Sequence, residues 1–367
     1  MNTTLTLAGR PLPLLGNLDA RTQKALLAGF VLLVPFVALF FGQSWVRVLD
    51  FALLYVLLAI GLNLVVGFAG LLDLGYIAFY AVGAYTWAFL ASPHFGIHLP
   101  FWIILPLGAG FAGLAGIALG FPTLRLRGDY LAIVTLGFGE IIRIFMNNMN
   151  QPVNITNGPQ GIDQIDPLVV AGLDLSLDFD LFGFKLPSVV LYYYVFVIAV
   201  IVALIVVRRF QISRIGRAWA SIRDDEMAAK AIGIDTRAMK LFAFAMGATF
   251  GGVSGGLFAA FQGFVSPESF SLMESIAVLT MIVLGGMGNL AGVVVGAVLL
   301  TALPEVLRQV AVPLQVAIFG KVLLDPEVLR MLLLSLAMIG MMLWRPAGLL
   351  PARTRYADRK GNERKNA

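Results

Sequence analysis

The chain has 367 residues, of which 59% are hydrophobic and 13% charged, and its mean hydropathy is +0.89. A soluble domain of this size would need more charge to cover its surface, so that class is excluded. The formal net charge of +5 does not indicate nucleic-acid binding, because the basic residues lie beside apolar runs of membrane-spanning length. Cys is absent and His occurs only twice, which excludes a disulfide framework and argues against a metal site.

About ten apolar runs are expected to form membrane-spanning helices, because backbone groups in lipid must be hydrogen-bonded within their own segment. The first run follows a basic segment, residues 1–24, and is expected to be retained rather than cleaved. The run at 276–303 contains Gly-Gly-Met-Gly-Asn, so we divide it there into two short or re-entrant helices. The predicted spans are 25–41, 51–68, 72–91, 101–121, 130–147, 191–208, 240–262, 276–288, 290–303 and 329–344.

The distribution of Lys and Arg orients these spans. With the N-terminus in the cytoplasm, most basic residues fall in inner segments, whereas the outer loops hold many acids. Both termini (1–24 and 345–367) and the segment 209–239 are then cytoplasmic, and the long loop 148–190 lies outside, as a connector or as a surface for an outer partner. The predicted fold is an all-α polytopic membrane protein with a transmembrane domain at 25–344, whose spans 2–5 and 7–10 would fit an inverted repeat.

The most heavily charged segment, 208–240, contains the signals of one short helix. Asp224 or Asp225 can cap its first turn, the alanines that follow favour helix, and Gly233 suits the position just after its end. The segment is therefore either an amphipathic cytoplasmic helix presented to a soluble partner or an ordinary solvated loop.

Polar side chains inside a membrane span must be paired with another polar group or be in contact with water. Three such residues in the predicted spans are therefore candidates for a translocation pathway: Asn63, Thr135 and Glu140. Glu140 either pairs with Arg143 one turn later or borders the passage. No central series of carboxylates and His appears, which argues against a proton-driven carrier.

A compact charged turn, Arg125, Arg127 and Asp129, follows the fourth predicted span. It is either an anchor at the membrane interface or a second cytoplasmic contact with a partner.

Several glycine patterns resemble nucleotide-binding or hydrolase motifs but lie inside apolar spans. We interpret them as small-residue helix packing, with pairs at Gly116/Gly120, Gly247/Gly251, Gly252/Gly256 and Gly292/Gly296. A Walker A sequence is absent, so we expect no enzymatic activity and no cofactor in this chain.

The segment Glu226-Met227-Ala228-Ala229 with Gly233 resembles the EAA–Gly loop of bacterial ABC importer permeases, although Met227 separates the Glu from the two Ala. Further stretches resemble LivM-type branched-chain amino-acid permeases, and the likeness runs from about residue 51 to 351. These stretches are 125–143, 156–161, 215–219, 267–270, 283–288 and 344–351.

The resemblance implies a subunit that imports leucine, isoleucine and valine across a bacterial inner membrane. It also implies a LivH-type second permease, two cytoplasmic ATPases that bind the ATP, a periplasmic binding protein, and membrane lipid around the spans. In that family the EAA loop is a coupling helix that enters a cleft of the ATPase. The residues expected to carry this contact are Arg223, Asp224, Asp225, Glu226, Ala228, Ala229 and Gly233. The alternatives are a urea or short-amide permease of the same family and an ion-coupled secondary amino-acid transporter.

Overall fold

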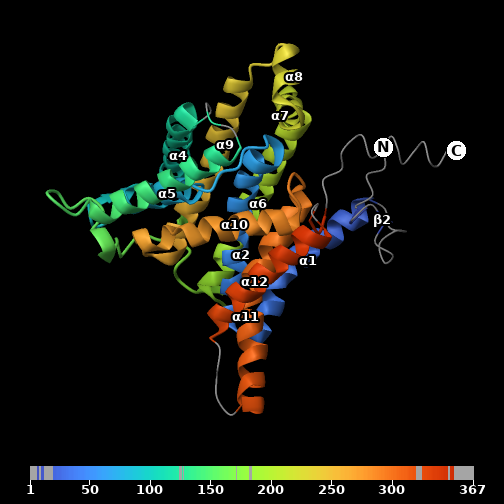
Figure 1. Ribbon diagram of the computed structural model, residues 1–367. Helices are drawn as coiled ribbons and strands as arrows, with labels where there is room; N and C mark the ends of the chain where they lie inside the picture. Colours follow the sequence, from blue (N-terminus) through green and yellow to red (C-terminus); the bar gives the residue numbers. More distant parts are fainter. Residues whose placement is uncertain are drawn as a thin grey trace.

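The computed structural model describes residues 6–7, 10–11, 20–123, 126, 128–170, 172–181, 184–319, 325–345 and 348–350, and it is a bundle of α-helices (Figure 1). The helices are α1 (Ala20–Phe41), α2 (Gln43–Asn63), α3 (Ile77–Leu90), α4 (Phe101–Thr123), α5 (Asp129–Asn148), α6 (Ser188–Ile212), α7 (Arg214–Asp224), α8 (Glu226–Ala231), α9 (Thr236–Gln262), α10 (Leu272–Gly285), α11 (Leu290–Phe319) and α12 (Pro326–Trp344). A π-helix, η1 (Leu64–Phe68), extends α2, and two 3-10 turns are η2 (Gly158–Gln160) and η3 (Pro267–Phe270).

Short strands form antiparallel hairpins beside the helices. The pairs are β1 (Thr6–Leu7) with β2 (Arg10–Pro11), β3 (Ala91–Ser92) with β4 (Ile97–His98), β5 (Val169–Val170) with β6 (Leu173–Asp174), and β7 (Phe179–Leu181) with β8 (Phe184–Leu186). The predicted helical class is confirmed, with these hairpins as an addition that the sequence did not indicate.

Several predicted boundaries are wrong. The second span begins at Gln43 rather than at residue 51, and the residues between η1 and α3 are not helical although they were predicted to begin a span. The helix predicted at 290–303 runs to Phe319 in the structure. The predicted cytoplasmic loop holds two helices, α7 and α8, rather than one.

Five helices in the described part of the chain are long and apolar enough to cross a membrane: Gln43–Phe68, Phe101–Thr123, Ser188–Ile212, Thr236–Gln262 and Leu290–Val310. Shorter apolar helices include α3 and α10, each of 14 residues. At a rise of 1.5 Å per residue such a helix is about 21 Å long, less than the ~30 Å hydrocarbon core of a bilayer. The structure therefore supports several crossings, and the number of about ten, like the inverted repeat, stays a prediction.

Small residues let α9 approach α3 and α4 closely. A Cβ added at Gly83 of α3 would lie 2.1 Å from the carbonyl oxygen of Gly252, and one added at Gly252 would lie 2.5 Å from Cβ of Ala112. One added at Gly116 would lie 2.6 Å from Cβ of Ala248. The predicted packing role of Gly116 and Gly252 is confirmed, and Gly83 has the same role, because no larger residue fits at these positions without moving a neighbouring helix.

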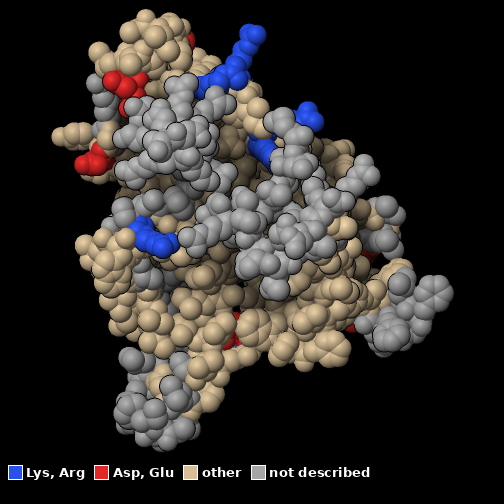
Figure 2. All heavy atoms as spheres, turned by 90° about the vertical axis from the view of Figure 1, so that its right-hand side faces the viewer, with Lys and Arg blue, Asp and Glu red and all other residues tan. Residues whose placement is uncertain are grey.

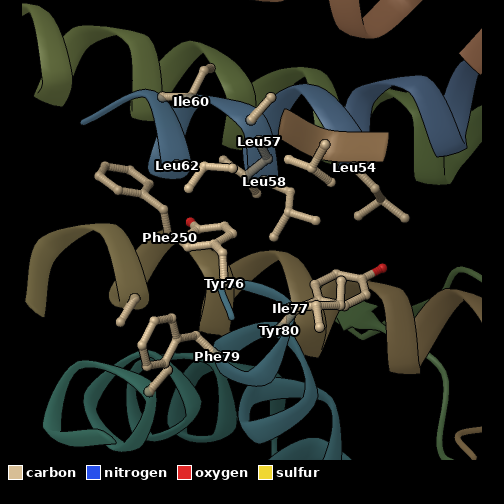
Figure 3. Close-up of a cluster of buried hydrophobic side chains, with 14 of the residues drawn as sticks. Leu54, Leu57, Leu58, Ile60, Leu62, Tyr76, Ile77, Phe79, Tyr80 and Phe250 are labelled. Atoms are coloured by element: carbon tan, nitrogen blue, oxygen red, sulfur yellow. The ribbon is translucent and has the colours of Figure 1, made fainter. Parts of the chain in front are cut away.

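A buried apolar cluster joins α2, α3 and α9 (Figure 3). Leucine side chains of α2 lie toward aromatic side chains at the start of α3 and toward Phe250 of α9, whereas Ile60 lies on the opposite side of α2. The Tyr76 hydroxyl lies within this cluster and donates a hydrogen bond to the carbonyl oxygen of Gly247 at 2.7 Å. The buried hydroxyl is thus satisfied, and it ties the beginning of α3 to α9.

Large apolar side chains are exposed on the outside of the bundle. Phe40 of α1 is 91% exposed, and Trp102 and Phe121 of α4 are about two-thirds exposed. In the described part of the face in Figure 2, uncharged residues prevail over Lys, Arg, Asp and Glu. Such a surface suits lipid or the apolar face of another membrane subunit.

Segments that the predicted topology places on the same side contact each other. On the predicted outer side, Ile162 pairs with Val265 in an antiparallel bridge. On the predicted inner side, the backbone N–H of Gly288 donates to Oδ1 of Asn63 at 2.9 Å, and that of Leu350 donates to the carbonyl oxygen of Gly285 at 3.0 Å. The structure thus groups the helix ends into two sets, as the predicted topology does. Which set faces the cytoplasm is predicted only from the distribution of Lys and Arg.

Candidate functional site

Helices α7 and α8 project at one end of the bundle, beside the start of α9 (Figure 1). The Ser213 hydroxyl caps α7 by accepting from the backbone N–H of Ile215 at 3.2 Å. Trp219 of α7 is fully buried, donates its indole N–H to the carbonyl oxygen of Met239 at 2.8 Å and stacks on Phe242. This amphipathic helix is therefore fixed to α9 through one aromatic side chain.

Helix α8 has the predicted caps. The Asp225 carboxylate accepts from the backbone N–H groups of Met227 at 2.8 Å and Ala228 at 3.1 Å. Gly233 has a φ of +86° and follows the helix end, where the left-handed conformation favours glycine. The interpretation of Asp225 as N-cap and of Gly233 as the terminating residue is confirmed.

Apart from Lys230, the exposed residues of α8 and of the position just after it are apolar. Met227 is 64% exposed and Ile232, just after the helix, is 73% exposed, whereas Ala229 is buried against the bundle. Ala228 and Ala231 are exposed beside them. We call Met227, Ala228, Ala231 and Ile232 the α8 tip. An apolar tip on a helix that projects from the bundle fits a contact with another protein.

Glu226 does not extend from the α8 tip but is held within the chain. Its carboxylate contacts Nζ of Lys240 at 2.7 Å and Nζ of Lys230 at 3.0 Å. Burial alone would raise the pKa of Glu226, but the hydrogen bonds from Lys240 and Lys230 outweigh it and lower the pKa from 4.5 to about 2. The Lys240 side chain is only 9% exposed, so Glu226 is the counter-ion of a nearly buried cation and locks α8 onto α9.

The remaining charged residues predicted for coupling are placed differently. Arg223, in the last turn of α7, donates from Nη1 to the carbonyl oxygen of Gly67 in η1. Asp224, at the end of α7, is exposed. Arg223 is exposed as a whole although its guanidinium is bonded to the bundle, so within the predicted set Arg223 and Glu226 contact the bundle while the remaining charged residues, Asp224 and Asp225, are exposed.

The predicted second cytoplasmic contact is described only in part, because Arg125 and Arg127 lie outside the described residues. Asp129 is the first residue of α5 and is exposed. It lines a cavity of about 240 Å³ together with Arg223 and Glu226. The structure thus brings Asp129 close to the base of the α7–α8 segment, where it would have to lie if both belonged to one partner surface.

Two of the three pathway candidates are buried and hydrogen-bonded within the chain. Asn63 is fully buried at the end of α2 and accepts from the backbone of Gly288. Thr135 is fully buried in α5 and accepts from the backbone N–H of Leu74 at 3.1 Å. In this conformation both side chains hold non-helical segments in place.

Glu140 pairs with its own helix, as one of the two interpretations predicted. Arg143 donates from Nε to the Glu140 carboxylate at 3.0 Å, and its Nη1 lies 3.1 Å from the Glu268 carboxylate in η3. The side chains of Glu140 and Arg143 are 38% and 23% exposed. An exposed ion pair on α5 is costly against lipid, so this face of α5 suits water or a partner subunit.

Sequence reasoning missed Asp50, which is fully buried in α2, and neither of its carboxyl oxygens has a hydrogen-bond partner among the described residues. The available signal was the apolar sequence that follows Asp50, residues 51–62, together with the high mean hydropathy of Gln43–Phe68. It also missed Lys240, whose role as a buried cation depends on a contact with Glu226 across a helix junction.

Comparison with known proteins decides the family. The family model described as branched-chain amino acid transport system / permease component matches residues 44–342. The chain belongs to this family. It is similar to the high-affinity branched-chain amino acid transport system permease protein LivM of Escherichia coli (strain K12), at 44% identity over 92% of this chain and 78% of the relative. LivM of Salmonella typhimurium matches with the same identity and coverage.

A second kind of permease protein from the same transport systems is more distantly similar. LivH of Escherichia coli (strain K12) is 26% identical over 71% of this chain and 84% of that relative. No solved structure matches the chain. The resemblance to LivM-type permeases is confirmed, and with its apolar helices the permease is a multi-pass membrane protein.

Proposed function

We propose that this permease is the transmembrane subunit of an ATP-driven importer of leucine, isoleucine and valine. The observation that carries the proposal is the α7–α8 segment, which projects from the bundle and carries the apolar α8 tip. The exposed apolar surface of the bundle, in contrast, suits a lipid environment. Family membership supports the substrate, because the similar permease proteins are named for branched-chain amino acid transport.

The partners follow from this role. A LivH-type permease would complete the passage, two cytoplasmic ATPases would bind ATP, and a periplasmic protein would deliver the amino acid at the outer side. The chain would lie in the bacterial inner membrane with both termini in the cytoplasm, and would itself supply neither a cofactor nor covalent chemistry.

In the proposed mechanism the α8 tip enters a cleft of the ATPase. Closure of the ATPase dimer on ATP moves α8, and the Glu226–Lys240 contact passes this movement to α9 because a nearly buried ion pair resists separation. Since α9 packs on α3 and α4 through glycines, these helices move as one body and alternate the access of the passage.

Transport by the reconstituted complex tests this function. We expect proteoliposomes with both permeases, both ATPases and the binding protein to accumulate labelled leucine only when ATP is present. Transport of urea without leucine would assign the chain to the short-amide branch instead. Leucine uptake that persists without the ATPases and follows an ion gradient would contradict the ATP-driven mechanism.

A substitution at the α8 tip tests the contact separately. We expect Met227→Asp with Ile232→Asp to abolish co-purification of the ATPases, because it places charge where an apolar surface is buried. Met273→Asp, at a methionine that is 58% exposed on α10, is the matched control and should leave recovery unchanged. Full recovery of the ATPases with the double variant would refute α8 as their contact.

A further inference from the structure

Arg223 joins the projecting segment to the inner end of α2. Its Nη1 donates a hydrogen bond to the carbonyl oxygen of Gly67, and its aliphatic stem lies against Gly70, where an added Cβ would be 2.9 Å from Cγ of Arg223. Arg223 is separated from Glu226 by only two residues, so any displacement of α8 reaches this hydrogen bond directly.

The carbonyl group of Gly67 is available because α2 ends in a π-helix. In an α-helix the N–H of Leu71 would bond to Gly67, but here it bonds to the carbonyl oxygen of Val65 at 3.1 Å. The N–H of Ala69 likewise reaches back to Leu64 at 3.3 Å. The guanidinium takes the place of the missing donor, and its charge complements the negative end of the helix dipole.

Gly67 is packed so closely against Asn63 and Gly288 that it cannot move without displacing them. A Cβ added there would lie 2.1 Å from Oδ1 of Asn63 and 2.6 Å from the backbone nitrogen of Gly288. Because Asn63 is itself bonded to Gly288, a displacement at Gly67 also displaces the turn between α10 and α11.

A cavity lies beside the contact between Arg223 and Gly67. The cavity of about 240 Å³ is bounded by segment 69–72 on one side and by Gly128, Asp129 and Leu131 at the start of α5 on the other. Ile222 and Arg223 line it as well. Gly70, Asp129 and Arg223 in its lining are exposed, so the cavity opens onto the surface and segment 69–72 has room to shift toward α5 without displacing packed atoms.

We propose that Arg223 is a positioning residue that transmits the displacement of α8 to α2, with segment 69–72 moving into the cavity beside it. This inference rests on the proposed function, since an ATPase must move α8. It assigns Arg223 to a contact inside the permease rather than to the ATPase surface. The π-helix is the deformable element, because its wider turn leaves a carbonyl group free to follow the guanidinium.

Three variants in the complete reconstituted complex test the link. Arg223→Met keeps the stem against Gly70 but removes the donors. We expect equal recovery of the ATPases and an unchanged basal ATP hydrolysis, but a loss of stimulation by the loaded binding protein and a fall of leucine uptake by about tenfold or more. Arg223→Lys retains a donor and a charge and should restore most of the stimulation.

Arg217→Met is the matched control. Arg217 lies on the same helix, and its Nη1 also donates to a backbone carbonyl, but that carbonyl belongs to Ile212, the last residue of α6, at 3.2 Å and only five residues earlier in the chain. This variant should keep full stimulation. Equal stimulation in Arg223→Met and in the unaltered complex would overturn the proposal, as would a failure of Arg223→Lys to restore any.

A cavity-filling variant tests the second half of the proposal and does not alter Arg223. Leu131→Phe enlarges a side chain that lines the cavity, and we expect it to suppress stimulation while assembly is retained. Leu131→Met conserves the volume and should behave like the unaltered chain. Full stimulation with Leu131→Phe would refute movement into the cavity. If the unaltered complex itself shows no ATP-dependent uptake, the proposed function fails, and the inference fails with it.

Discussion

The contact of Glu226 with Lys240 allows the cost of opening the α8–α9 junction to be estimated. Replacing Glu226 by Gln keeps the shape of the side chain but removes the negative charge next to a nearly buried ammonium group. The variant therefore tests whether the ion pair, rather than packing, holds α8 against α9.

The lowered pKa gives the magnitude. A pKa of about 2 in place of 4.5 corresponds to roughly 3 kcal/mol of stabilisation at pH 7. Because the folded-state pKa is depressed, this contribution is fully present above about pH 4.5 and is lost as the pH falls toward 2. At pH 3 about 1.4 kcal/mol should remain.

Hydrogen exchange in the purified permease measures this directly. The amides of Ala229 and Ile232 are bonded within α8, to Asp225 at 3.0 Å and Ala228 at 3.2 Å, so their protection reports its opening. We expect Glu226→Gln to lower their protection at pH 7 by about a hundredfold. The difference from the unaltered chain should shrink as the pH falls to 3.

The control is the other partner of the same carboxylate. The Lys230 side chain is 42% exposed, so Lys230→Gln should cost only about 0.5 kcal/mol. Equal losses of protection in the two variants, or a Glu226→Gln effect that is the same at pH 7 and pH 3, would refute the ion pair as the lock.

Three further predictions concern the bundle and are checked by thermal unfolding in detergent. Gly255→Ala places a Cβ 2.0 Å from a backbone oxygen of α3 and should cost about 3 kcal/mol or more, whereas Gly137→Ala, with open space around it, should not destabilise. Asp50→Leu should stabilise by about 1 kcal/mol because it replaces buried carboxyl oxygens that have no hydrogen-bond partner among the described residues by an apolar side chain of similar size, and a loss of stability would show that the carboxyl group has a partner. A double-mutant cycle on Arg143→Gln and Glu268→Gln should give a coupling of about 1 kcal/mol or less, since the Glu268 side chain is 61% exposed, and a larger value would contradict the exposed geometry.

Local chemistry predicted the caps of α8 correctly. Caps act on backbone groups within a few residues, so the sequence predicted Gly233 and limited the N-cap to Asp224 or Asp225, of which the structure selects Asp225. The glycine pairs were also predictable, because spacing of four residues places small side chains on one helical face whatever the partner helix is.

Boundaries that depend on distant packing were not predictable. The sequence predicted the second span from residue 51, directly after Asp50, but the structure buries Asp50 within α2. It predicted a helix that ends at residue 303, yet α11 continues through Pro304 and Pro313, although proline breaks helices in water. Within a bundle, neighbouring groups can satisfy the backbone that proline frees.

The roles of the loop charges were the least predictable part of the site. The sequence shows Arg223 and Glu226 as neighbours in one polar segment, which favours a common role at a partner surface. The structure gives them different partners. Glu226 forms an ion pair with Lys240, 14 residues away, and Arg223 donates a hydrogen bond to the carbonyl oxygen of Gly67, 156 residues away. Besides the partly exposed Lys230, the outward surface of α8 then consists of the α8 tip, its methionine, alanines and isoleucine. The charges fix the projection to two different helices, and a push on its apolar tip therefore reaches α2 and α9 together.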